Sequence, residues 1–209
     1  MTYLEIGRLL RANTSGFVFG VRVSQLDLPT DSLPCFGALV RVPQERGYQI
    51  YGLIHDIHID DDGLVRQLVT AEGVEESVIA DNRLNRNVPL EMSVLSVGYE
   101  LDKAIYHLLP PRPPLSLDII YLCEADEICR FTSAGRFGYF RHVLRAVDLP
   151  VGELLAAHIQ QAQTAHAAVG DPDWVNAATQ ELITLLRDDY PSLMGVLGAL
   201  SDALPGTPQ

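Results

Sequence analysis

The sequence predicts an α+β protein in which a small N-terminal β-barrel precedes a C-terminal domain of about three helices. Up to residue 122 the chain consists of short apolar runs, mostly of period two, separated by Gly and Asn/Asp turns. Beyond residue 124 the apolar residues recur at helical spacing instead. The predicted units are a barrel (1–124), a connecting segment rich in arginine and aromatic residues (125–149), an acidic helical domain (150–204) and a tail (205–209).

The barrel is predicted from a succession of strands and turns. It opens with two apolar stretches on either side of a polar turn at 13–16. The more polar stretch 70–89 is expected to be a loop with at most one short helix. The further strand-like runs are rich in Val, Ile, Leu and Tyr, and they cover residues 21–26, 38–43, 49–54, 64–69 and 90–101.

Four prolines surround Arg112 between residues 110 and 114. Because proline continues neither a helix nor a sheet ladder, this segment is expected to form a stiff, extended crossing. The crossing would lead into a last barrel strand at 117–122. A polyproline ligand for a partner domain is the alternative interpretation.

Three helices are predicted in the C-terminal part. The first covers about 150–169, where apolar residues follow helical spacing. The second begins with Asp171 as its N-cap and Pro172 as its first helical residue. The third starts at Pro191. Before them, 125–131 is expected to form a turn or two of helix, and 138–147 a helix or a strand.

The formal net charge of −12 limits the partners that the surface can attract. An acidic surface repels phosphate backbones and anionic lipids, which weighs against nucleic-acid and membrane binding. The charge is concentrated at the C-terminal end, where residues 146–209 hold eight acids and one base, Arg187.

The three cysteines, Cys35, Cys123 and Cys129, form no CxxC motif and leave one thiol unpaired in any scheme. This usage predicts a reduced, cytoplasmic compartment. Charged residues within the first ten positions argue against a signal-peptide core. The uncharged stretch 190–201 is too short to cross a bilayer.

The sequence predicts neither a catalytic site nor a cofactor, since it contains no phosphate loop, no GxGxxG after a strand and no GxSxG. The best metal-like group is Asp56, His58 and Asp60, because alternate residues of a strand share one face. A metal-dependent hydrolase at His58 is therefore one alternative function. The competing interpretation is a solvated hairpin face.

Residues 130–145 interleave four arginines with aromatic residues in an otherwise acidic chain. Arginine beside aromatic rings can stack on bases, so a nucleic-acid accessory protein is a second alternative. Ion pairing with the acidic tail or with a partner protein is the favoured use. The candidate interaction residues in this segment are Arg136, Tyr139, Arg141 and Arg145.

The predicted helices have apolar faces that must be covered by the barrel, by one another or by a partner chain. We expect two of these faces to contribute to docking. Their residues are Leu182, Leu185 and Leu186 on the second helix and Leu193, Val196 and Leu197 on the third.

Several short motifs of the first half occur in an order that resembles the HAS-barrel. This β-barrel is shared by HerA-like ATPases and the N-terminal domains of rotary ATP synthase subunits. The resemblance covers about residues 4–122. The matching positions are Ile6-Gly7-Arg8, Gly37 before the strand 39–42, Tyr51-Gly52 with Ile54, and the proline crossing.

The resemblance implies a barrel that holds subunits or partners together around an ATPase. The chain departs from the family where a phosphate-loop core should follow, because it has a helical segment there. Motor activity therefore does not transfer. We expect a non-enzymatic adaptor that docks a HerA-like ATPase or associates with copies of itself.

Overall fold

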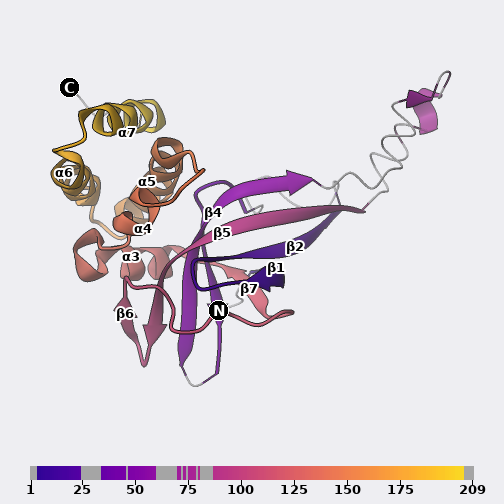
Figure 1. The fold of residues 1–209 in the computed structure, drawn as a ribbon, viewed down its shortest axis with the longest axis horizontal. Helices are drawn as coiled ribbons and strands as arrows, with labels where there is room; N and C mark the ends of the chain where they lie inside the picture. The colour runs from indigo at the N-terminus through magenta and orange to yellow at the C-terminus, as the bar shows by residue number, and fades with distance from the viewer. Residues whose placement is uncertain are drawn as a thin grey trace.

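The computed structural model describes residues 4–24, 34–45, 47–59, 70, 71, 73, 75–78, 80 and 87–204. Within these residues the predicted α+β architecture is confirmed, with strands in the N-terminal half and helices in the C-terminal part (Figure 1). The strands are β1 (Glu5–Ala12), β2 (Gly16–Ser24), β3 (Leu39–Pro43), β4 (Tyr48–Ile59), β5 (Asn87–Leu101), β6 (Ala104–Tyr106) and β7 (Ile119–Leu122).

Six of these strands close into an antiparallel barrel. Their order is β2-β1-β7-β3-β4-β5, and β2 pairs with β5 to complete the ring. That pairing runs without a register shift from Gly16 opposite Leu95 to Ser24 opposite Asn87. Register shifts in β1 and β4 mark bulges, which increase local twist and help a sheet to curve.

The barrel interior is filled by large apolar side chains, as the alternation along the strands predicts. Gly52 of β4 permits a close approach of its neighbours, since a Cβ there would lie 2.3 Å from Val94 Cγ1. The inward-facing residues of this core include Leu9, Phe19, Val40, Ile54, Met92 and Ile120.

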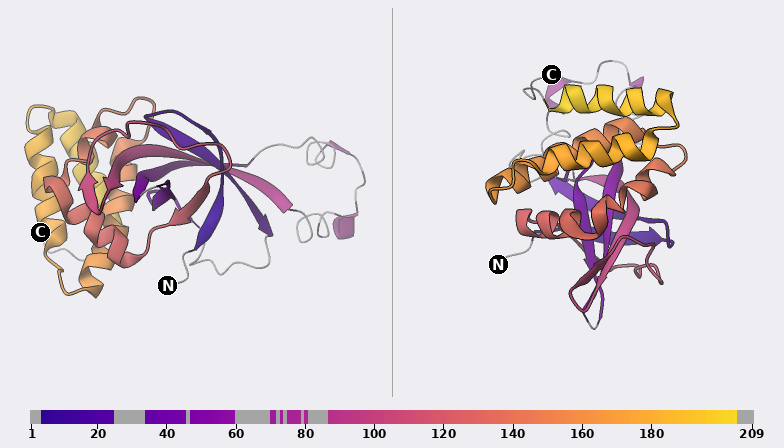
Figure 2. Two further views of the ribbon diagram at one scale, coloured as in Figure 1. Left: turned by 90° about the horizontal axis from the view of Figure 1, so that it is seen from below. Right: turned by 90° about the vertical axis from the view of Figure 1, so that its left-hand side faces the viewer.

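The helical part contains more elements than about three helices. The three predicted helices are present as α5 (Val151–Ala168), α6 (Trp174–Leu186) and α7 (Tyr190–Ala203). Within 125–149 the structure adds α3 (Ala125–Ser133), the 3₁₀ turn η2 (Ala134–Phe137) and α4 (Phe140–Leu144). All of them gather at one end of the barrel (Figure 2).

Several predicted boundaries need correction. The N-cap of α6 is Asp173, and the Asp171 carboxylate instead accepts a hydrogen bond from His166 Nδ1 at 3.2 Å. Strand β5 begins at Asn87, inside the stretch expected to be a loop. The hairpin that adds β6 was not predicted, because Asp102 and Lys103 adopt positive φ without the usual Asn-Gly signature. The predicted strand 64–69 lies outside the described residues.

Barrel and helices share one hydrophobic core. Leu39, Tyr51 and Val97 of the barrel belong to the same buried cluster as the apolar faces of α3–α7. At Gly37, where φ is +81°, the backbone approaches α5 so closely that a Cβ would lie 2.7 Å from Ala157 Cβ. The helical layer is therefore packed directly on the barrel.

A buried ion pair crosses the same boundary. Arg41 Nε of β3 lies 2.6 Å from Glu127 Oε1 of α3, and both side chains are buried. The Arg41 guanidinium also stacks over the Tyr121 ring at 4.9 Å. Separating the two residues would leave an uncompensated buried charge, which is costly. This pair therefore fixes the position of α3 on the barrel.

Candidate protein-docking surfaces

The barrel wall exposes three large apolar side chains around the end of the proline crossing, Leu10, Leu115 and Leu117, which we name the leucine patch. Leu117 is 70% exposed and has a φ of +73°. Its backbone N–H donates to the Leu9 carbonyl at 2.8 Å, and Ser116 Oγ donates to the Leu10 carbonyl at 3.4 Å. The crossing therefore lies along β1, and the patch belongs to one surface.

The leucine patch is supported by polar contacts beneath it. The Asp118 carboxylate accepts hydrogen bonds from the Leu115 N–H and from Gln44 Nε2, each at 2.7 Å. Arg8 Nη1 donates to the Leu117 carbonyl at 3.3 Å. These bonds hold an exposed segment in a single shape, which favours binding because little ordering is needed.

A second surface lies on α4 and the turn before it. Arg141 and Arg145 stand one helical turn apart, and Arg136 is exposed in η2. Burial lowers the pKa of His142, and the charges of Arg141 and Arg145 lower it further, which shows that these cations lie close together. We name Arg136, Arg141 and Arg145 the arginine patch.

The backbone of the preceding turn is strained. Gly135, Arg136 and Phe137 all have φ between +49° and +57°. Left-handed geometry is unfavourable for Arg and Phe, so the surrounding packing must impose it. The packing is visible at Gly135, where a Cβ would lie 2.9 Å from Nδ1 of the buried His107.

Among the described residues, the arginine patch has no carboxylate partner. Arg141 Nη2 donates to the His107 carbonyl. Among the described residues, none of the ion pairs involves Arg136, Arg141 or Arg145. Of the two favoured uses, ion pairing with the acidic tail is not seen in the part of the tail that the structure describes, and pairing with a partner protein stays a prediction.

The aromatic residues of the same segment are not surface groups. Phe131, Tyr139 and Phe140 are fully buried, and Phe137 stacks on Phe140 with ring centroids 5.5 Å apart. Tyr139, predicted as an interaction residue, instead places its hydroxyl 3.2 Å from His158 Nε2. None of these buried rings is available to stack on a base.

The helical leucines predicted for docking are mostly internal. Leu182, Leu186 and Val196 are buried in the shared core, and Leu193 and Leu197 pack against it. Only Leu185 of this set is largely exposed, at 45%. Packing within the fold therefore covers most of the two apolar helix faces that were expected to dock a partner.

The turn between α6 and α7 exposes a different group. Asp188 and Asp189 lie beside the exposed Leu185, Tyr190 and Met194, which we name together the acidic turn. The Asp188 side chain is 89% exposed and forms an ion pair of 3.2 Å with Arg187, whose side chain is 73% exposed. Tyr190 and Met194 were not predicted, because their exposure depends on which face of α7 meets α5.

A groove of about 500 Å³ lies next to the arginine patch. Val147 and Leu149, between α4 and α5, line one side, and His55 and Val94 of the barrel line another. Burial lowers the pKa of His55, so its imidazole stays neutral at physiological pH. The groove therefore combines apolar side chains with polar ones of the barrel, including Arg11, and Arg145 directly precedes the lining residue Ala146.

Two of the three predicted metal candidates lie among the described residues. Asp56 and His58 are exposed on β4 and lie opposite Ser93 and Glu91, whereas Asp60 lies outside the described residues. Within the described part of the chain, no group of three His, Cys, Asp or Glu side chains is placed to hold a metal ion.

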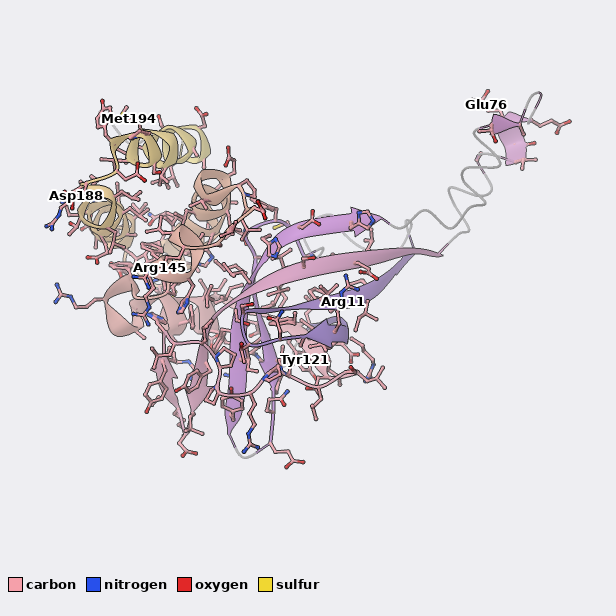
Figure 3. The ribbon with its side chains drawn as sticks, in the orientation of Figure 1. Arg11, Glu76, Tyr121, Arg145, Asp188 and Met194 are labelled. Atoms are coloured by element: carbon pink, nitrogen blue, oxygen red, sulfur yellow. The ribbon has the colours of Figure 1, made fainter. Side chains whose placement is uncertain are left out.

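Figure 3 shows the surfaces on different parts of the molecule, with Tyr121 on the barrel and Arg145, Asp188 and Met194 on the helical end. Over the described residues, none of the helices is long and apolar enough to cross a membrane. Comparison with protein-family models and with curated proteins found no match to the chain.

Proposed function

We propose that this protein is a non-catalytic adaptor whose barrel docks a partner protein, either a HerA-like ATPase or a further copy of the chain. The leucine patch is the observation that supports this most directly. Exposed clusters of large apolar side chains mark protein-binding surfaces when they are contiguous. Here the cluster lies on the wall of a closed barrel. The sequence of that barrel resembles the HAS-barrel of such ATPases.

The connection between barrel and helices suits an adaptor. The buried Arg41–Glu127 pair and the shared core make the helical layer move with the barrel. A partner bound at the leucine patch would therefore be held in a defined position relative to the helical end. This relation is what an assembly module needs in order to connect two components.

Affinity capture from the native cell extract tests the proposal. The tagged wild-type chain is expected to recover a HerA-like ATPase, or untagged copies of itself, in near-equal amount. The double variant Leu115→Asp/Leu117→Asp should lose that partner. Aspartate tolerates the left-handed backbone at 117, so the fold should survive.

Val169→Asp is the control, because it places one of the two added charges on an exposed aliphatic position at the end of α5 instead. Circular dichroism and thermal unfolding establish that each variant is folded. The proposal is refuted if the double variant captures the same partner as the wild type. It is also refuted if the bait is recovered alone and has the mass of a monomer.

A further inference from the structure

The arginine patch and the acidic turn are oppositely charged surfaces, and among the described residues no ion pair joins them. Asp188 contacts Arg187, and Asp189 caps α7 through Ser192. The first presents Arg136, Arg141 and Arg145, which form no ion pair among the described residues. The second presents Asp188 and Asp189 within the most acidic part of the sequence. A chain with a net charge of −12 has acids in excess, yet these cations are not neutralised within the described fold.

The apolar groups around the charges also match. Val147, 80% exposed, follows Arg145 closely and lines the groove between the barrel and the helical layer. Tyr190, 69% exposed, directly follows the two aspartates of the acidic turn. An aromatic side chain beside acids suits a partly apolar groove near arginines, because aromatic residues are enriched in protein interfaces.

The same geometry selects against a nucleic acid as the occupant. The aromatic rings of the arginine segment are buried, and the backbone of a nucleic acid would meet an acidic protein surface. A short acidic protein segment can contact the arginine patch alone, whereas a nucleic acid carries phosphate charge along its whole length. The chain itself supplies one, at the exposed turn between α6 and α7.

We propose that copies of the chain associate through the acidic turn of one copy, which docks on the arginine patch of another. Asp188 faces Arg145 across this contact, and Tyr190 enters the groove beside Val147. The inference deepens the proposed adaptor function, on which it rests, by naming the surface that joins copies. It does not involve the leucine patch.

Charge reversal tests the contact by sedimentation velocity of the full chain at low and high salt. The wild type should associate as its concentration rises, and salt should weaken the association. Arg145→Glu alone and Asp188→Arg alone should each sediment as a monomer. An equimolar mixture of the two variants should associate again, because Glu at 145 then meets Arg at 188 and the unchanged pair remains available.

Arg112→Glu is the matched control, since it changes the net charge equally on an exposed arginine of the proline crossing. It should associate as the wild type does. The inference is overturned if the wild type stays monomeric at low salt, if Arg112→Glu is as damaging as Arg145→Glu, or if the mixture remains monomeric. If the wild type is monomeric and binds heparin, and Arg145→Glu abolishes that binding, the arginine patch is a polyanion site and the inference is overturned.

The two proposals fail separately. Partner capture that depends on the leucine patch, together with a monomeric wild type, refutes the contact between copies alone. If association depends on the charge reversals as expected, but no partner or copy is captured through the leucine patch, only the docking role of the barrel wall is refuted.

Discussion

Acid is expected to weaken the packing of α5 on the barrel through His158. This side chain is 1% exposed, and its Nδ1 lies 3.2 Å from the Gly37 carbonyl. Since a carbonyl only accepts, Nδ1 must be the protonated nitrogen, and Nε2 accepts from the Tyr139 hydroxyl at 3.2 Å. The neutral imidazole thus satisfies both of its neighbours.

Burial lowers the pKa of His158 from 6.5 to about 4, so the folded protein excludes a proton that the unfolded chain takes up. The resulting stability is fully present above the unfolded pKa and is lost as the pH falls through 6.5 toward 4. Between about pH 8 and about pH 5 this one group should lower the free energy of unfolding by about 2 kcal/mol.

Urea unfolding at a series of pH values measures the effect. His158→Gln keeps a donor and an acceptor but does not titrate, so its free energy of unfolding should depend on pH less steeply by the same amount. His58→Gln, which makes the same replacement at an exposed histidine of β4, is the control variant. If His158→Gln loses stability with acid as steeply as the wild type, burial of this imidazole is not the cause.

Two further changes probe the packing of the fold. Glu127→Gln leaves Arg41 without its buried anion and should lower the free energy of unfolding by about 3 kcal/mol, whereas replacing both residues with leucine should restore part of the loss. A double-mutant cycle by chemical denaturation measures both effects. Equal losses in the single and double variants would contradict the prediction. Gly52→Ala should cost about 1–3 kcal/mol, because the new methyl group collides with Val94. Gly195→Ala, in the open middle of α7, should instead raise the free energy of unfolding by about 0.5–1 kcal/mol. Thermal unfolding measures both glycine variants, and a change of the same sign in the two would refute the reasoning.

Much of the secondary structure could be predicted because its signals are local. The start of α7 is an example, since the Asp189 carboxylate accepts from the Ser192 N–H and Pro191 fits the first turn. The alternation of apolar residues likewise placed most strands within a few residues of their bounds. The start of α6 was misplaced because Asp171 and Asp173 offer the same local signal, and only His166 in the folded protein distinguishes them.

The candidate surfaces were less predictable. The sequence identified Arg136, Arg141 and Arg145 as unusual cations, but it could not show that the described part of the tail forms no ion pair with them. It treated Tyr139 and the helical leucines as docking residues, and packing buried most of them. The leucine patch was missed because Leu10 and Leu115 are more than a hundred residues apart in the chain.

The sequence by itself determined the class of the fold, the order of barrel and helices, the proline crossing and the acidic C-terminal charge. These features follow from periodicity, turn chemistry and composition, which act over a few neighbouring residues. Only the tertiary structure decided the closure of the barrel by β2 and β5, the burial of Arg41 against Glu127 and the exposure of Tyr190. An apolar or charged side chain finds its partner across the whole chain, so its burial or exposure depends on contacts that no local pattern contains.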